Sequence, residues 1–384
     1  MTANAPEPSL RFSGPILVTG ESALQLSLAA FFAKTGHRVI LLDDDEAARE
    51  RSGHFLGQIL RHEYEPHNAW LNHIVQHITG ESFPEVELLV DAGNDRPKDR
   101  GTRLAAMKDH LARGALILIQ TTIADLGPYQ GLIDAGFNVR MVNFQAPAHR
   151  APLVEIAKDE RILATDPELE NWLSGLGKIC VPVAFVDGFL ANRIERRFYE
   201  GAERLLLRGA LPYEIDEALV ASGFSIGPFE AQDLSGLDGP YYARRSERER
   251  LPEARHFKAL VSDRMVEEGR LGKKVGVGWY RYPGGGGAVI DPLIEDLIAE
   301  EAHFAKIPRR EFSDDEIVRY LNAVLGKACE ACLDAGIVEE ATTVDRVASL
   351  VLNLPEGPLA YAKRHGAEAL AVDLNIVSAD GPAS

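Results

Sequence analysis

The chain has little of what marks a secreted, membrane-spanning or disulfide-stabilised protein. Only three cysteines occur in 384 residues, which excludes a disulfide framework. The opening residues, MTANAPEPSLRF, show neither a basic start nor an apolar run, as a signal or transit peptide would. No stretch reaches the roughly 18 uninterrupted apolar residues of a membrane span. We therefore expect a cytoplasmic protein with no membrane partner.

Positive charge and metal-ligand clusters are also scarce. The formal net charge is −17, whereas nonspecific binding of nucleic acid needs a basic face, so we expect no nucleic-acid partner. Cys329 and Cys332 form a CxxC pair without a second pair, and we interpret them as buried small residues of a helix. His73 and His77 share a face of an expected helix, but nothing nearby completes a ligand set. No metal site is predicted.

What is present begins with alternating strands and helices. The apolar runs PILVTG at 15–20 and RVILLD at 38–43 are typical of buried strands, and apolar residues recur between them at helical spacing. Further strands are expected at 86–92, 115–121, 139–144 and 179–185. This start is typical of the dinucleotide-binding fold, so we predict a Rossmann-like, doubly wound, mostly parallel sheet.

After residue 186 the pattern changes to helices with short loops, and a weak internal repeat appears. The segments that align are 202–210 with 329–337, 215–219 with 344–348, and 227–229 with 357–359. We interpret them as two tandem helical units, with chance similarity between helices as the alternative. The predicted domains are a dinucleotide-binding domain at 12–185, a helical domain at 186–290, and a second, degenerate helical repeat at 291–384.

Three phrases in this helical half resemble the substrate domain of the 3-hydroxyacyl-CoA dehydrogenase family. They are GFLANR at 188–193, GFSIGPFEAQD at 223–233 and EGRLGKKVGVGWYRY at 268–282. The resemblance implies a Rossmann-like sheet followed by two tandem all-α domains of this family's C-terminal type. It also implies NAD-dependent oxidation of the 3-hydroxyl group of an acyl-CoA substrate, as in fatty acid β-oxidation. Because family members pair through this domain or carry it twice, we expect a homodimer or a monomer with an internal pseudo-dimer.

The cofactor site is expected after the first strand, where a dinucleotide fold has GxGxxG. Gly20 keeps the first glycine, but Ser22 and Gln25 replace the other two, so NAD binding should be weak or lost. Asp43 ends the second strand, where it can accept hydrogen bonds from the adenosine ribose, with a solvated strand end as the alternative. Asp91, at the end of a later strand, is a further candidate contact. Three consecutive carboxylates from Asp43 onward favour NAD over NADP.

The catalytic phrase of the family has the form HFFNPxxxxxLVE, in which the histidine takes the hydroxyl proton and the glutamate orients it. Anchoring on LVE puts Glu155 at the carboxylate and Asn143 at the histidine. An amide cannot accept a proton near neutral pH, so general-base catalysis worth roughly 10²–10⁴-fold would be missing. His149 is the candidate for a displaced base, with an exposed loop histidine as the alternative.

Two polarising residues match the family better. Thr122 keeps a hydroxyl where the family has a serine, and Asn192 in GFLANR matches an asparagine whose amide can bind the substrate carbonyl. Two hypotheses follow. In the first, the protein is a dehydrogenase with a rearranged site, in which these residues and Glu155 act with His149 or water. In the second, it is a catalytically inactive relative that serves as a binding or scaffold protein.

Overall fold

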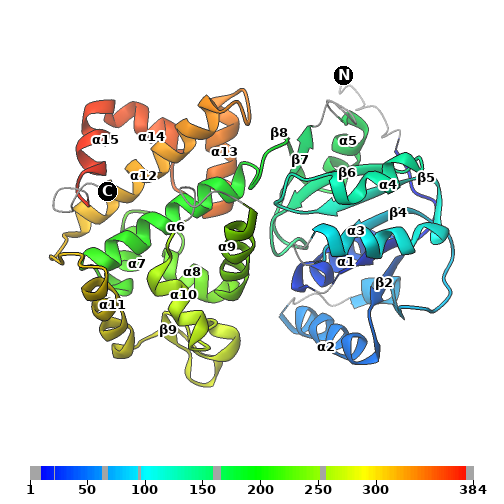
Figure 1. Cartoon of the computed structure of the whole chain (residues 1–384), viewed down its shortest axis with the longest axis horizontal. Coiled ribbons are helices and arrows are strands. Elements are labelled where there is room, and N and C mark those ends of the chain that lie inside the picture. The colour runs from blue at the N-terminus through cyan, green and yellow to red at the C-terminus, as the bar shows by residue number, and fades with distance from the viewer. Residues whose placement is uncertain are drawn as a thin grey trace. The chain divides into compact units, whose positions relative to one another are not determined.

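The structure is a computed structural model that describes residues 10–20, 22–62, 68–93, 97–158, 166–250 and 257–377. The chain divides into two compact units, the first ending at Phe189 and the second beginning at Leu190. Figure 1 shows an α/β unit and a unit built mainly of helices, which confirms the predicted fold class. Among the described residues, no helix is long and apolar enough to cross a membrane.

The α/β unit is built on one sheet, whose described strands follow the order β3-β2-β1-β4-β5-β6-β7-β8. Their bounds are β1 (Ile16–Thr19), β2 (Val39–Asp43), β3 (Ile74–Ile78), β4 (Val86–Asp91), β5 (Leu111–Gln120), β6 (Asn138–Phe144), β7 (Leu153–Lys158) and β8 (Ile179–Ala184). All neighbours run parallel except β6 and β7, which are antiparallel. The order reverses between β1 and β4, and doubly wound sheets bind their ligands at such a reversal.

Helices accompany the strands of this sheet. They are α1 (Ala23–Lys34), α2 (Glu46–His62), α3 (Pro97–Ala106), α4 (Gln130–Asp134) and α5 (Pro167–Gly175), with short 3₁₀ helices at Asn68–His73, Lys108–His110 and Gly127–Tyr129. Helix α1 packs on β1 and β2, and its Phe32 stacks on Trp172 of α5 with ring centroids 5.9 Å apart. Because α1 is buried over most of its length, its sequence is apolar almost all round.

Two strands differ from the sequence-based expectation. A helix was expected through His73 and His77, but His73 ends a 3₁₀ helix and His77 lies in β3, so the two do not share a helical face. Strand β3 is half-buried and lies at the edge of the sheet, and its IVQHI sequence lacks the continuous apolar run of the central strands. Strand β7 was not predicted either, although it contains the LVE phrase.

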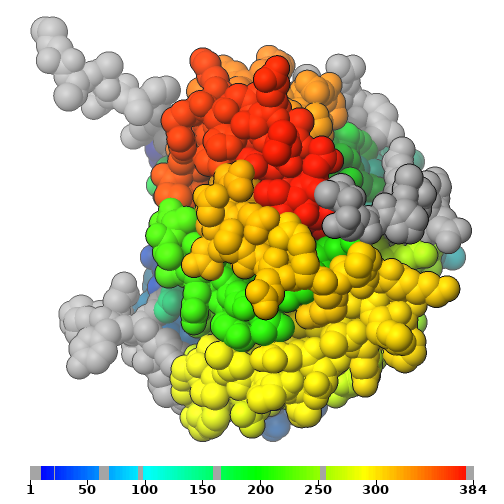
Figure 2. Space-filling model, turned by 90° about the vertical axis from the view of Figure 1, so that its left-hand side faces the viewer, coloured from blue at the N-terminus to red at the C-terminus, as the bar shows by residue number. Residues whose placement is uncertain are grey.

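In the second unit, several helices pack against one long helix, α12 (Asp314–Asp334). The other elements are α6 (Ala191–Arg208), α7 (Pro212–Ala221), α8 (Pro228–Ser235), α9 (Asp238–Arg250), α10 (Leu260–Glu267), α11 (Pro292–Phe304), α13 (Ala341–Leu352), α14 (Pro358–His365), α15 (Ala367–Leu374), 3₁₀ helices at Lys273–Val275 and Pro283–Gly285, and the antiparallel pair β9 (Tyr280–Arg281) and β10 (Val289–Ile290). Helix α12 packs on α6, α7, α14 and α15, and Figure 2 shows it in amber beside the red C-terminal helices. Cys329 and Cys332 are buried in α12, as predicted.

Two parts of the helical unit repeat the same contact. Asp216 of α7 accepts hydrogen bonds from two backbone N–H groups at the start of α8, at 3.0 and 2.9 Å. Asp345 of α13 does the same at the start of α14, at 2.7 and 3.1 Å. A Cβ at Gly227 or Gly357 would lie 2.2 or 2.4 Å from the carboxyl carbon of the respective aspartate. These matched contacts support the proposal of two tandem units.

Candidate cofactor and active site

The turn after β1 is held close to the chain that leaves β4. Gly20 has φ +137°, and a Cβ added there would lie 2.5 Å from the carbonyl carbon of Ala92 and 2.6 Å from the nitrogen of Gly93. Only glycine satisfies both the backbone conformation and this close approach. The turn at the first predicted cofactor residue is therefore fixed by sterics.

Ser22 is the N-cap residue of α1. Its Oγ accepts a hydrogen bond from the backbone N–H of Gln25 at 3.1 Å and donates one to the carbonyl oxygen of Ala92 at 2.8 Å. Gln25 is buried, and its Nε2 donates to the carbonyl oxygen of Leu42 at 3.0 Å. A helix N-terminus binds phosphate through its unpaired N–H groups, and here a serine hydroxyl already takes one of them.

Asp43 is buried at the end of β2, with 3% of its surface exposed, so the solvated-strand-end alternative is wrong. Its Oδ1 accepts a hydrogen bond from the Ser52 hydroxyl at 2.7 Å, and its Oδ2 accepts one from Gln76 at 3.5 Å. Burial raises the pKa of this carboxyl, and these two hydrogen bonds oppose the shift. A ribose would have to compete with Ser52 for the carboxylate.

Asp91 is also buried, at the centre of an ion-pair cluster. Its Oδ2 accepts a hydrogen bond from Arg100 Nε at 2.7 Å, and its Oδ1 accepts one from Arg103 Nη2 at 2.6 Å. Arg100 donates further to the carbonyl oxygens of Asp91 and Gln120, at 3.0 and 2.8 Å. Asp91 therefore holds α3 to the sheet, and it faces two guanidinium groups with one carboxylate.

These contacts decide how a dinucleotide, the ligand that the fold implies, fits the chain. The N-terminus of α1 is capped, and Asp91 is engaged by arginines. Gly20 keeps the tight turn after β1. Arg103 places a cation at the same edge of the sheet, and its Nε is buried and has no hydrogen-bond partner among the described residues. A diphosphate therefore fits this edge through the arginine. Sequence reasoning missed Arg103, since it lies outside the glycine motif.

Asn143 and Glu155 face each other across the antiparallel pair β6 and β7, where they are register partners. Asn143 Nδ2 donates to Glu155 Oε2 at 2.8 Å, and Asn143 Oδ1 accepts from Gln120 Nε2 at 3.0 Å. Glu155 is completely buried, and Asn143 is 8% exposed. The structure thus brings together the two residues at the base and carboxylate positions, but an amide stands where the proton acceptor was expected.

The other predicted catalytic residues are spread over both units. Thr122 follows β5, the neighbour of β6, and its carbonyl oxygen accepts a hydrogen bond from the N–H of Gly188 at 2.7 Å. His149 is half-buried between β6 and β7, with its Nδ1 2.9 Å from Ser27 Oγ of α1, which corrects the alternative of an exposed loop histidine. Asn192 is half-buried in the first turn of α6, in the helical unit.

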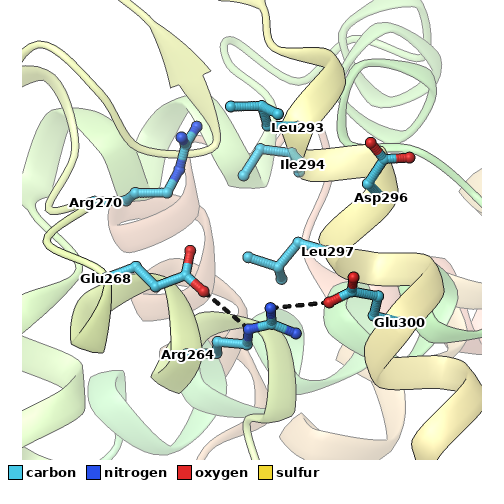
Figure 3. A pocket seen from close by; sticks show the side chains of 8 residues that line it. All are labelled: Arg264, Glu268, Arg270, Leu293, Ile294, Asp296, Leu297 and Glu300. Carbon is cyan, nitrogen blue, oxygen red and sulfur yellow. Dashed lines mark hydrogen bonds and ion pairs between the residues drawn. The ribbon is translucent and has the colours of Figure 1, made fainter.

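A separate hollow of about 310 Å³ lies in the helical unit between α10 and α11 (Figure 3). Arg264 on its wall pairs with Glu268 at 3.0 Å and with Glu300 at 2.9 Å, and Arg270 pairs with Asp291 at 2.6 Å. Its cations are therefore already neutralised, and it contains none of the predicted site residues. In the described part of the chain, no cluster of three His, Cys, Asp or Glu side chains could hold a metal ion.

The chain thus combines a doubly wound sheet with a unit built mainly of helices. Residues 188–282 match the family model described as 3-hydroxyacyl-CoA dehydrogenase, C-terminal domain. Over these residues the chain is similar to that domain.

Solved structures share the fold over most of the chain. The 3-hydroxybutyryl-CoA dehydrogenase from Escherichia coli K12 has a TM-score of 0.74 and 21% identity, covering 98% of this chain and 97% of that one. The dehydrogenase part of multifunctional enzyme 1 from C. elegans has a TM-score of 0.68 and 18% identity, covering 97% and 86%. The (S)-3-hydroxybutyryl-CoA dehydrogenase from Ralstonia eutropha has a TM-score of 0.57 and 21% identity, covering 70% and 98%. At these identities the likeness is one of fold.

Proposed function

We propose that the protein is a hydroxyacyl-CoA dehydrogenase-like oxidoreductase that oxidises the 3-hydroxyl group of an acyl-CoA thioester with NAD, as in fatty acid β-oxidation. The observation that supports this proposal best is the match of residues 188–282 to the C-terminal domain of the family. That segment contains Asn192, whose amide would donate a hydrogen bond to the substrate carbonyl.

Each of the candidate residues would have a different role in this reaction. The chemistry that bound NAD would supply is the acceptance of a hydride from C3. The hydroxyl of Thr122 would polarise the reacting oxygen, while Glu155 holds the amide of Asn143 in one orientation. The hydroxyl proton would pass to water or to His149, because an amide cannot accept it near neutral pH. We therefore expect slow turnover.

The direct test is the reduction of acetoacetyl-CoA by NADH at high enzyme concentration, followed by NADH absorbance. Slow consumption that depends on both substrates is the expected result. A further loss of rate in His149→Ala would assign the proton to that imidazole, whereas an unchanged rate would leave it to water. No consumption, together with no change in NADH fluorescence on mixing, would contradict the enzyme proposal.

A second candidate is a catalytically inactive relative that binds acyl-CoA as a scaffold or binding partner. The observation that favours it is the hydrogen-bond chain from Gln120 through Asn143 to Glu155, which leaves no base at the expected position. This candidate predicts that calorimetry detects acetoacetyl-CoA binding to the wild type while no NADH is consumed. Turnover that requires His149 would rule it out.

A further inference from the structure

Arg103 lies where the strand order of the sheet reverses. It projects from α3 toward the end of β4, and its guanidinium is so close to Gly93 that a Cβ added there would lie 2.2 Å from Arg103 Nη2. Gly20 approaches the same peptide from β1, since its added Cβ would lie 2.6 Å from the nitrogen of Gly93. The cation and the turn that follows β1 therefore meet at the carboxyl ends of β1 and β4.

Arg103 is paired with a buried carboxylate but keeps one donor that the described residues leave unused. Asp91 is shared between Arg103 and Arg100. Within the described residues, Arg103 Nε is buried and makes no hydrogen bond. A buried N–H without an acceptor costs free energy, which an anionic acceptor would recover. Because 26% of the Arg103 side chain is exposed, a ligand can reach the guanidinium.

The usual anion contact of this fold is not available in the same form. Where a glycine-rich turn would offer unpaired N–H groups, the Ser22 hydroxyl accepts the N–H of Gln25 at 3.1 Å. Arginine can replace such a contact, because its planar guanidinium donates two parallel hydrogen bonds to a phosphate. The guanidinium of Arg103 would supply a cation and hydrogen-bond donors beside the turn that follows β1.

We propose that Arg103 binds a phosphate group of a diphosphate ester at the junction of β1 and β4, in place of the N-terminus of α1. The ligand class is a nucleoside diphosphate or a dinucleotide that contains one. That the physiological ligand is NAD rests on the proposed function, whereas the phosphate contact does not. Arg103 acts here as a binding residue and takes no part in bond making or breaking.

The test is calorimetric titration of the full chain with ADP. We expect wild-type protein to bind ADP, and Arg103→Gln to bind it about tenfold to a hundredfold more weakly, which corresponds to the loss of one charged hydrogen-bonded contact. Affinity in the wild type should fall more steeply with added salt than in the variant. Arg113→Gln is the matched control, since it removes an exposed arginine from the first half of β5 and should leave ADP affinity unchanged.

A second variant guards against loss of folding. Arg103→Lys keeps a cation beside Asp91 but not the planar pair of donors, so it should melt like the wild type and bind ADP several-fold more weakly. Equal ADP affinity in all the variants, or no ADP binding by the wild type, would overturn the proposal. The two proposals fail separately. ADP binding through Arg103 without acetoacetyl-CoA turnover contradicts only the enzyme function, and turnover with an unchanged KM for NADH in Arg103→Gln contradicts only the Arg103 site.

Discussion

The two units differ in how closely they follow the family resemblance described above. In the helical unit, Asp233 belongs to GFSIGPFEAQD, one of the phrases that resemble the family. It accepts hydrogen bonds, both at 2.9 Å, from the N–H groups of Trp279 and Tyr280, which belong to another of these phrases. In the α/β unit, Ser22 and Asn143 stand where the family resemblance expects other residues, and they too are hydrogen-bonded inside the protein. In the α/β unit, the residues that differ from the resemblance are therefore part of the hydrogen bonding of the fold.

The residues that depart from the resemblance in the α/β unit would change the chemistry of the site, but they are well integrated in the packing. Ser22 caps α1, and Asn143 joins β5 to β7 through Gln120 and Glu155, so each replacement has its own structural contacts. A residue that is integrated in this way stabilises the fold without a ligand. In the helical unit, residues of two of the phrases form a buried hydrogen-bond network around Asp233. Changes in the two units should thus have effects of different kinds.

The largest expected effect is a gain of activity in the α/β unit. Asn143→His would place an imidazole beside Glu155, whose carboxylate now accepts the Asn143 amide at 2.8 Å. Restoring a general base should raise the rate of acetoacetyl-CoA reduction by roughly 10²–10⁴-fold. The measurement is NADH consumption across a pH series, in which a new pH dependence near the pKa of histidine should appear.

Asn138→His is the matched control for this change, because Asn138 is exposed at the start of the same strand. It adds the same side chain away from Glu155 and should leave the rate unchanged. A rate for Asn143→His equal to that of the wild type would mean that the missing base is not what limits this unit.

The next largest effect is a loss of stability in the helical unit. Asp233→Ala removes the acceptor of the two N–H groups and of the Tyr282 hydroxyl, all in a buried site. Three buried donors without a partner should cost on the order of 3–5 kcal/mol of unfolding free energy. Urea denaturation measures this loss.

The control for Asp233→Ala is Asp238→Ala. Asp238 pairs with Lys274 at 2.5 Å near the surface, and such pairs contribute about 0–1 kcal/mol. If both variants lost the same free energy, the network around Asp233 would not be the source of the stability of this unit.

Much of the fold was predictable because local patterns determine it. Strands β1 and β2 are buried on both faces, so their sequences are continuous apolar runs that stand out from the helices. Strand β3 was missed because it lies at the sheet edge, where a half-buried strand can alternate with polar residues. Strand β7 is almost fully buried, but its charged Glu155 interrupts the apolar run.

The candidate site was predictable only in part. The pairing of Asn143 with Glu155 followed from family spacing, because the two positions lie on adjacent strands joined by one loop. The environment of Asp43 and the role of Arg103 depend on tertiary packing. Ser52 and Gln76, which surround Asp43, come from different elements, and Arg103 reaches the sheet only because α3 folds back over β4. Contacts of this kind leave no periodic pattern in the sequence from which they could be predicted.

A smaller effect should separate the two matched contacts of the helical unit. Asp216 is buried and also accepts a hydrogen bond from the Tyr280 hydroxyl at 2.8 Å, whereas Asp345 is partly exposed and can exchange its contacts for water. Asp216→Ala should cost roughly 2–3 kcal/mol and Asp345→Ala about 1 kcal/mol. Thermal melts of both variants measure the difference, and equal losses would argue that the first contact gains nothing from its burial.

A further effect is a pH dependence of stability in the same unit. Burial is the main cause that raises the pKa of Asp216 to about 7 and that of Asp233 to about 6, against the hydrogen bonds that favour the charged forms. A carboxyl with a raised pKa in the folded state holds its proton more tightly than in the unfolded chain, so stability falls as pH rises from about 4 to the folded pKa. Melts at about pH 5 and about pH 8 should therefore differ by at least about 1 kcal/mol in the wild type.

Two variants assign this decline in stability to its residues. Asp216→Asn should remove the part of the decline that ends near pH 7, and Asp233→Asn should remove the part that ends near pH 6. A decline that persists unchanged in both variants would show that other groups cause it.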